Sequence, residues 1–205
     1  MTAKATHIIS GSWRRVFMLA LALLALAVPA LQQGARAQMG DMTGMSGMSG
    51  HSMLLTPLGH KRAPLDFTLK DVMTGKPVRL SSLRGKVVVV NFWSLACPAC
   101  RAELPTLQKL WHKLKGMDVE VLAVHIGGDA AKVRAFMQKN DIKVPVLHDE
   151  GENVAKAWGV AHMPVTYVLD TEGKLAFIAY GARNWQNPQL MRMLLTLVSP
   201  LHGNE

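Results

Sequence analysis

The sequence predicts an α/β fold with a mixed central sheet flanked by helices and an N-terminal hairpin extension. Four consecutive valines lie within residues 86–92, a pattern typical of a strand that is buried on both faces. Apolar residues recur at helical spacing in residues 98–115, and a second apolar strand is predicted over 118–126. Strands and helices alternate here before a later hairpin and a final helix, an order that places helices on both faces of a mixed sheet.

Local signals place the first elements of the predicted domain, which spans residues 63–202. Residues 67–69 and 77–80 flank a turn that contains a glycine, so they should pair as a hairpin. A short capped turn is expected over 81–85, directly before the valine-rich strand. The helix that follows this strand has a face of leucines and one tryptophan, and it should end at Gly116.

The C-terminal half is predicted from caps and turn residues. Asp129 can accept a hydrogen bond from the first backbone N–H groups of a helix. A short helix is expected over 153–158. The apolar runs 165–169 and 175–180 flank a turn with a glycine and should pair antiparallel. Pro188 suits the first position of the final helix, where its missing N–H is not needed.

Residues 1–37 have the three-part layout of an export signal. A basic leader with the pair Arg14-Arg15 precedes an uncharged core of mostly Leu and Ala over 16–31, and small residues follow. Because this core is short for a membrane span, we expect a cleaved secretory signal, with an uncleaved membrane anchor as the alternative. The arginine pair also resembles a twin-arginine signal, although Trp13 precedes it where Ser or Thr is usual. Either route places the folded domain in the periplasm, where disulfide chemistry is possible.

The composition narrows the classes of function. Of the 205 residues, 49% are hydrophobic and 18% are charged, which is typical of a globular protein. The net charge is +9, and without the predicted signal the remaining excess of +5 is mild and spread along the chain, so it predicts no nucleic-acid surface. The two cysteines are too few for a disulfide framework or for a four-cysteine zinc site. We expect a monomer that requires no cofactor.

The segment 38–62 is predicted to be flexible and begins with a methionine repeat. Methionines stand at every third position among Gly, Ser, Asp and Thr, a composition that cannot bury a core. Thioether sulfur is a soft ligand that selects Cu(I), and the repeat resembles the Met-rich segments of bacterial periplasmic copper-handling proteins. A spacer that binds no metal, or that serves as an oxidant sink, is the alternative. The candidate Cu(I) ligands are Met39, Met42, Met45, Met48 and His51.

Cys97 and Cys100 stand where a buried strand ends and a helix begins. The free N–H groups and the dipole of a helix N-terminus stabilise an anion, so Cys97 should form a nucleophilic thiolate. Cys100 lies one turn later and can resolve a mixed disulfide. Two buried structural thiols, or half of a metal site, are the alternatives. We prefer redox chemistry because buried thiols do not require this junction and no further metal ligands occur at a convincing spacing.

Phe92-Trp93 followed by Cys97-x-x-Cys100-Arg101-x-Glu103-x-Pro105 resembles the thioredoxin superfamily and, within it, the TlpA/ResA/DsbE branch of exported thiol-disulfide oxidoreductases. The resemblance extends from Ala63 to about Leu197 and includes the motif Met163-Pro164-Val165-Thr166. It implies a thioredoxin-like fold. Two positions depart from the pattern of the branch: Ala96 stands where tryptophan usually adjoins the nucleophile, and Met163 stands where Val, Thr or Ile commonly precedes the proline.

The resemblance also implies roles for neighbouring residues. Glu103 corresponds to the acidic residue of the branch that assists proton transfer at the cysteines, and burial should raise its pKa. An exposed glutamate paired with a lysine is the alternative. Pro164 corresponds to the cis-proline that faces the disulfide, and Met163 and Trp93 are expected to contact the substrate. Asn91 replaces the buried aspartate of cytoplasmic thioredoxins and cannot take a proton.

These inferences predict a periplasmic thiol-disulfide oxidoreductase that acts as a reductant through Cys97 and Cys100. The resemblance implies substrates among cytochrome c maturation or copper-site proteins and a membrane electron donor of the DsbD/CcdA type. The rival function is copper binding or delivery by the Met-rich segment, although Sco-type copper proteins place three residues between their cysteines. Peroxidase action is a weaker option, since no Pro-x-x-x-Thr-x-x-Cys motif occurs. No role is assigned to His125, His148 or Asp149.

Overall fold

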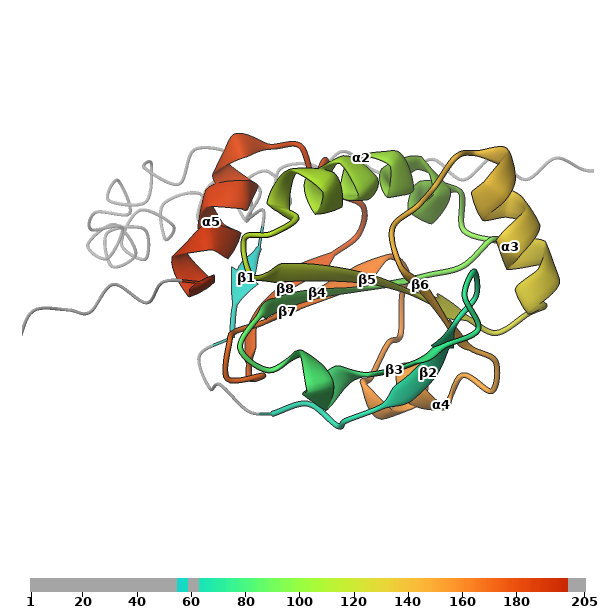
Figure 1. Cartoon of the computed structure of the whole chain (residues 1–205), viewed down its shortest axis with the longest axis horizontal. Helices are drawn as coiled ribbons and strands as arrows, with labels where there is room; N and C mark the ends of the chain where they lie inside the picture. Colours follow the sequence, from blue (N-terminus) through green and yellow to red (C-terminus); the bar gives the residue numbers. More distant parts are fainter. Residues whose placement is uncertain (1–54, 59–62, 199–205) are drawn as a thin grey trace, which may run out of the picture. The chain divides into compact units, whose positions relative to one another are not determined.

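The valine-rich strand is β4 (Val87–Trp93), and all seven of its residues are buried in the computed structural model, which describes residues 55–58 and 63–198. It lies inside an eight-stranded mixed sheet, parallel to β5 (Val119–Ile126) and antiparallel to β7 (Val165–Leu169). Figure 1 shows the sheet beneath α2. Successive side chains of a strand point to opposite faces of its sheet. A strand that is apolar at nearly every position can therefore be stable only where both faces are covered.

The other strands complete a sheet with the order β1-β8-β7-β4-β5-β6-β2-β3. β5 and β6 are parallel, whereas the pairs β1–β8, β7–β8, β2–β6 and β2–β3 are antiparallel. The predicted mixed sheet is confirmed. The strands not yet given are β1 (Thr56–Pro57), β2 (Thr68–Asp71), β3 (Pro77–Arg79), β6 (Val146–Asp149) and β8 (Leu175–Tyr180).

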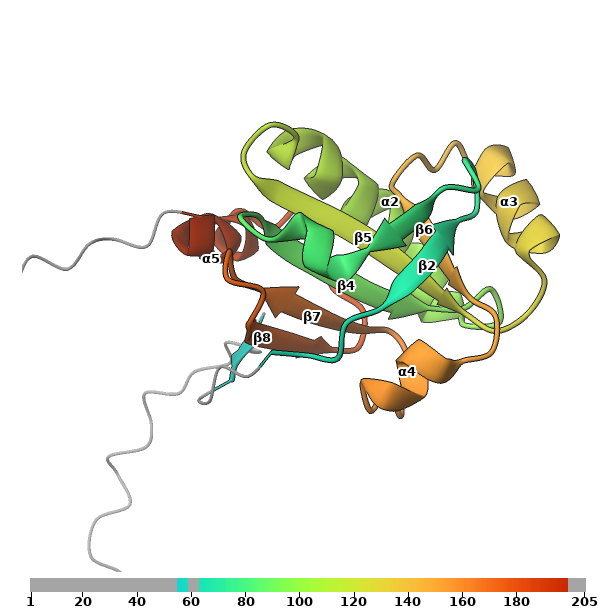
Figure 2. The same ribbon diagram turned by 60° about the horizontal axis from the view of Figure 1, so that its bottom comes forward.

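Helices cover both faces of the sheet, as predicted. One face carries α2 (Pro98–Leu114), α3 (Ala130–Lys139) and α5 (Pro188–Val198), whose buried side chains form one core with alternate residues of β4. The other face carries α4 (Asn153–Ala157) and the 3-10 helix η2 (Leu80–Leu83), which lie over a second core. Figure 2 shows α4 on the side of the sheet opposite α2 and α3.

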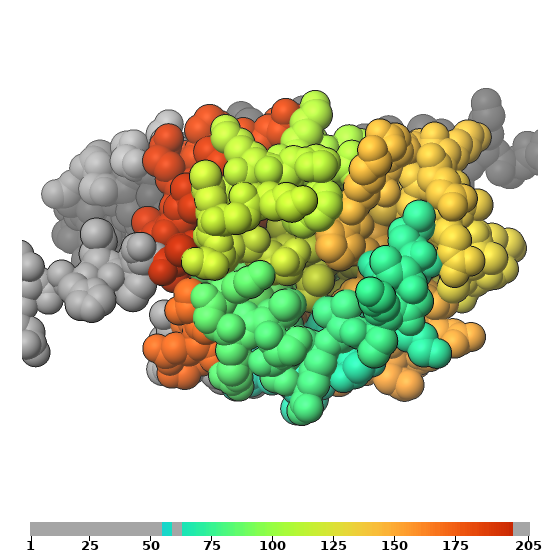
Figure 3. All heavy atoms as spheres, viewed as in Figure 1, coloured from blue at the N-terminus to red at the C-terminus, as the bar shows by residue number. Residues whose placement is uncertain are grey.

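The predicted hairpin extension is the pair β2–β3, which continues the sheet beyond β6. A side-chain hydrogen bond joins it to α3, because Arg134 Nε donates to the carbonyl of Val72 at 2.8 Å. Figure 3 shows the hairpin at the surface beside α3. The 3-10 helix η2 then occupies the place of the expected short turn and leads into β4.

The predicted cap Asp129 and the predicted start of the last helix at Pro188 are also confirmed. Asp129 Oδ1 accepts from the backbone N–H of Ala131 at 2.7 Å at the start of α3. Asn187 Oδ1 accepts from the N–H of Gln189 at 2.8 Å, and α5 begins at Pro188. Each of these helices therefore begins directly after a residue whose side chain accepts a hydrogen bond from one of its free N–H groups.

Two short strands are absent from the sequence prediction. β6 has four residues, two of which are His148 and Asp149, so its apolar pattern is too short to recognise. β1 falls within the segment 38–62, where the prediction of a flexible segment is wrong for residues 55–58. Leu55 is buried, and Thr56 and Pro57 pair with β8.

The predicted export signal, residues 1–37, and the proposed copper ligands between Met39 and His51 lie outside the described residues. Within the described part of the chain, no helix has the length and apolar character needed to cross a membrane.

Candidate active site

The two cysteines lie at the junction between β4 and α2. β4 ends at Trp93, the N–H of Cys97 donates to the carbonyl of Ser94 at 3.1 Å to close a turn, and α2 begins at Pro98. Cys97 is the N-cap of α2, and its Sγ accepts from the backbone N–H of Cys100 at 3.1 Å. The two sulfurs form a disulfide with Cα atoms 5.3 Å apart. The predicted placement of the pair at a helix N-terminus is therefore confirmed.

The two sulfurs occupy different environments. Cys97 is partly exposed, whereas Cys100 is fully buried in the core beneath α2. In the reduced protein, the N–H groups and the dipole of the helix N-terminus favour the thiolate of Cys97. Of the two sulfurs, only that of Cys97 is therefore accessible to another molecule.

Glu103 lies one turn after Cys100 and is 3% exposed. Its Oε1 accepts from the Asn91 amide at 2.5 Å, and its Oε2 accepts from the backbone N–H of Arg183 at 2.8 Å. The same Asn91 amide donates to Thr166 Oγ1 at 2.9 Å. The carboxyl group of Glu103 thus joins α2 to β4, to β7 and to the loop after β8.

Burial raises the pKa of Glu103, while the hydrogen bonds from Arg183 and Asn91 oppose this shift. Removal of a carboxylate from water disfavours its charged form, and here this effect exceeds that of the donors. The expectation that Glu103 is buried with a raised pKa is confirmed, and the alternative of an exposed glutamate is wrong. Its role in proton transfer stays a prediction.

Met163 and Pro164 face the cysteine pair from the loop before β7. The peptide bond between them is cis, as the resemblance implies. The carbonyl oxygen of Met163 lies 3.9 Å from Cys97 Sγ, and 39% of the Met163 surface is exposed. The N–H of Gly181 donates to the Pro164 carbonyl at 2.8 Å and holds this loop against the end of β8. A contact between Met163 and the substrate stays a prediction.

Trp93 is not placed to contact a substrate. It is 0% exposed, and its ring lies edge-on to His125 at 4.9 Å and near Phe136 at 5.9 Å, measured between ring centroids. The alternation of β4 directs Trp93 into the core under α2 and α3. The expected substrate contact of Trp93 is therefore wrong, and its packing supports the site from within.

His125, to which the sequence gives no role, contacts the turn that precedes Cys97. It is 2% exposed, and its Nε2 accepts from the backbone N–H of Leu95 at 3.1 Å, in the turn before Cys97. Burial lowers the pKa of His125 to about 4, helped by the neighbouring His148 and opposed by the Gly127 backbone. The contact with Leu95 follows from the parallel register that pairs Trp93 with His125, so a prediction of this register would have been needed to find it.

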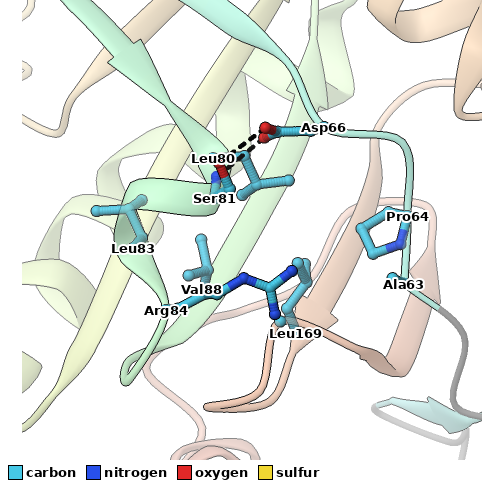
Figure 4. A pocket seen from close by; sticks show the side chains of 10 residues that line it. Ala63, Pro64, Asp66, Leu80, Ser81, Leu83, Arg84, Val88 and Leu169 are labelled. Carbon is cyan, nitrogen blue, oxygen red and sulfur yellow. Dashed lines mark hydrogen bonds between the residues drawn. The ribbon is translucent and has the colours of Figure 1, made fainter.

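A pocket shown in Figure 4 lies at the other end of the sheet and is separate from the cysteine pair. Its lining includes Val88, near the start of β4, and Arg84, whereas the cysteines follow the end of β4. Asp66 at its rim accepts hydrogen bonds from the backbone N–H and the hydroxyl of Ser81 at 2.9 and 2.7 Å. Within the described residues, no cluster of three His, Cys, Asp or Glu side chains could hold a metal ion.

Comparison with known proteins agrees with this site. The model of the AhpC/TSA family matches residues 60–178. The thiol-disulfide oxidoreductase ResA of Halalkalibacterium halodurans is 29% identical over 66% of this chain and 75% of its own length. ResA of Oceanobacillus iheyensis is 36% identical over 57% of this chain and 62% of its own length, so the chain spans less than two thirds of that relative.

Among solved structures, the Chlorobium tepidum protein proposed to be the thiol:disulfide interchange protein DsbE is 26% identical to this chain. It superposes with a TM-score of 0.63, over 69% of this chain and 99% of its own. The comparisons confirm the predicted resemblance and the thioredoxin-like fold. They also agree with the expected class of enzyme, a thiol-disulfide oxidoreductase.

The raised pKa of Glu103 predicts how stability changes with pH. Between the ordinary carboxyl pKa of 4.5 and the raised value, the folded chain binds more protons than the unfolded chain. The free energy of unfolding of the wild type should therefore fall as the pH rises through this interval. Glu103→Gln removes this titration, so its stability relative to the wild type should increase with pH and then level off. Urea unfolding of the oxidised proteins between pH 4 and 8 measures the difference.

Glu150→Gln is the matched control, because it removes a carboxylate from an exposed position.

The pH dependence of the alkylation rate of the reduced cysteines should also differ between Glu103→Gln and the wild type. Parallel stability curves and identical alkylation profiles for wild type and Glu103→Gln would contradict the assignment.

Proposed function

The chain belongs to the AhpC/TSA family, and from that premise we propose that it is an exported thiol-disulfide oxidoreductase that reduces disulfides in other proteins. The observation that carries this proposal is the asymmetry of the pair, with Cys97 partly exposed at a helix N-terminus and Cys100 buried. The relatives named thiol-disulfide oxidoreductase ResA support the same reaction class.

The reaction is a dithiol–disulfide exchange in two steps. The Cys97 thiolate attacks one sulfur of the substrate disulfide, forms a mixed disulfide and releases the other substrate sulfur as a thiolate, which takes a proton. The Cys100 thiol loses its proton and attacks Cys97 Sγ, which releases the second substrate thiolate and leaves the Cys97–Cys100 disulfide. Two electrons pass from the pair to the substrate.

Glu103 is the group we propose to accept the Cys100 proton. A buried thiol in apolar surroundings loses its proton reluctantly, so a nearby base assists the second step. Burial raises the pKa of Glu103, which makes its carboxylate a stronger base than an exposed glutamate. Asn91 and the Arg183 N–H hold the two carboxylate oxygens, so the base keeps a fixed position on the helix that carries Cys100.

We propose that the protein works in the periplasm as a monomer and receives electrons from a membrane donor of the DsbD/CcdA type. The predicted export signal supports this location. The proposed substrates are oxidised cysteine pairs in proteins of cytochrome c maturation or of copper sites. Such substrates are extended segments that could approach Cys97 beside the exposed Met163.

Single cysteine variants test the order of the two steps. Cys100→Ser should accumulate a mixed disulfide through Cys97, because no second thiol can resolve it. Cys97→Ser should accumulate none, and turnover should fall to background in both variants. The assay incubates the reduced variants with an oxidised Cys-x-x-Cys-His peptide and detects the adduct by mass spectrometry. An adduct on Cys97→Ser and not on Cys100→Ser would reverse the proposed roles.

The midpoint potential of the Cys97–Cys100 couple tests the direction of electron flow. A reductant should have a value near that of thioredoxin, about −270 mV, whereas a strong oxidant of the DsbA kind lies near about −120 mV. Equilibration in thiol redox buffers, followed by alkylation and mass measurement, gives the value. A potential near the oxidising end would contradict the assignment as a reductant and leave the exchange chemistry in place.

The rival proposal is copper binding by the Met-rich segment, and the regular methionine repeat favours it. A chain that begins at residue 38 should bind Cu(I) in preference to Zn(II), because thioether ligands are soft. The control replaces all four methionines with leucine, which keeps their apolar character and removes the sulfur. Both chains are titrated with Cu(I) against a competing chelator, with the cysteines oxidised so that thiolates do not bind the metal.

Loss of Cu(I) affinity in the leucine variant supports the copper proposal. Equal Cu(I) affinity of the two chains would leave the segment as a spacer. The replaced residues are Met39, Met42, Met45 and Met48.

A further inference from the structure

The turn between β4 and α2 sets the position of the nucleophile. Within it, the N–H of Cys97 donates to the carbonyl of Ser94 at 3.1 Å, and the N–H of Ala96 donates to Ser94 Oγ at 3.3 Å. These bonds fix the shape of the turn but not its orientation on the domain. The orientation decides whether Cys97 Sγ stays in line with the first N–H groups of α2, where it accepts from Cys100 N–H.

Side chains from two different elements hold the peptide groups of Leu95, in the middle of this turn. Its N–H donates to Nε2 of His125, on β5, at 3.1 Å. Its carbonyl accepts a hydrogen bond from the guanidinium of Arg101, on α2. The turn is therefore anchored from the sheet on one side and from the helix on the other.

The anchor from the sheet is the rigid one. His125 is 2% exposed and its ring packs edge-on against Trp93, whereas Arg101 is exposed. Because Nε2 accepts a hydrogen bond, its ring proton lies on Nδ1, whose interaction with the Gly127 backbone falls short of hydrogen-bond geometry. Burial of a poorly satisfied donor is unfavourable. An apolar ring would fill the same space without this penalty, so packing alone does not explain a histidine here.

We propose that His125 is a positioning residue that holds the Leu95 peptide and thereby keeps Cys97 Sγ at the N-terminus of α2. The inference rests on the proposed function, since it concerns the reactivity of the nucleophile in that reaction. The lone pair on Nε2 of neutral His125 accepts the hydrogen bond from the Leu95 N–H. Loss of this acceptor lets the turn move and reduces the stabilisation of the Cys97 thiolate by the helix N-terminus.

The surroundings of His125 agree with a neutral ring. Its titratable neighbour is His148 on β6, whose ring centroid lies 5.8 Å away and whose Nε2 bonds the Gly127 carbonyl at 3.0 Å. Burial and this second histidine both disfavour a proton on Nε2 of His125. The ring therefore stays available as an acceptor near neutral pH.

The test compares exchanges on neighbouring strands. His125→Phe keeps a buried aromatic ring but removes the acceptor, and His148→Phe makes the same exchange at a ring that does not contact the turn. At pH 7, the alkylation of Cys97 in the reduced protein should slow about fivefold in His125→Phe, the effect expected for loss of one hydrogen bond. His148→Phe should react like the wild type. His125→Gln, which offers an acceptor at a similar distance from the backbone, should recover part of the rate.

An unchanged rate in His125→Phe, or an equal loss in His148→Phe, would overturn the proposal. A second measurement on the ¹⁵N-labelled wild type applies even where a variant does not fold. The N–H···N hydrogen bond should give a scalar coupling between the Leu95 amide nitrogen and His125 Nε2, and its absence would overturn the proposal. Neither readout needs a substrate. Failure of the mixed-disulfide trap would contradict the proposed function and leave the positioning role intact.

Discussion

The start of α2 only one short turn after the end of a fully buried strand is the constraint on which the site depends. β4 is fixed by β5 on one side and β7 on the other, so the strand cannot shift without breaking both ladders. The turn after Trp93 is only a few residues long, and hydrogen bonds from Leu95 to His125 and Arg101 connect it to β5 and α2. This places Cys97 at the rim of the sheet and directs Cys100 into the core, so one element gives the two thiols opposite surroundings.

A buried carboxyl group extends this rigidity to the rest of the site. Glu103 bonds the side chain of Asn91 on β4 and the backbone of Arg183 after β8. One turn further along α2, Thr106 Oγ1 accepts from the N–H of Trp185 at 3.2 Å, and Trp185 is fully buried. The segment after β8 is thus attached to the active-site helix at two successive turns. The same segment holds the cis-proline loop through Gly181, so both walls of the site share one support.

Patterns local in the sequence were sufficient for most of the fold. The valine run of β4, the apolar face of α2 and the capping residue Asp129 each determine their own element, and each element is found where predicted. Contacts between strands were harder to predict. β6 is short and half polar, and β1 is stable only because Leu55 is buried and its backbone pairs with β8.

The same difference between local patterns and contacts across strands applies to the residues of the site. The positions of the cysteine pair, Glu103 and Pro164 could be predicted because these residues stand in one motif or at one proline. The contact of His125 with Leu95 depends on the register of β5 against β4, which cannot be predicted from the sequence. Trp93 was misplaced for a related reason: its neighbours in the sequence form the site, but the alternation of β4 turns its side chain to the interior.

The balance of charges around Glu103 explains why a neutral amide suits position 91. A carboxyl group at position 91 would lie in contact with that of Glu103. The pKa of one of the two would then rise strongly, because two negative charges so close together in a buried site repel each other. Asn91 instead donates to Glu103, which favours the charged form and offsets part of the effect of burial. Burial still dominates, so the pKa of the carboxyl group remains raised. In the proposed proton transfer, the two effects act together: burial makes the Glu103 carboxylate a stronger base for the buried thiol, and the hydrogen bond from Asn91 favours the charged form that accepts the proton.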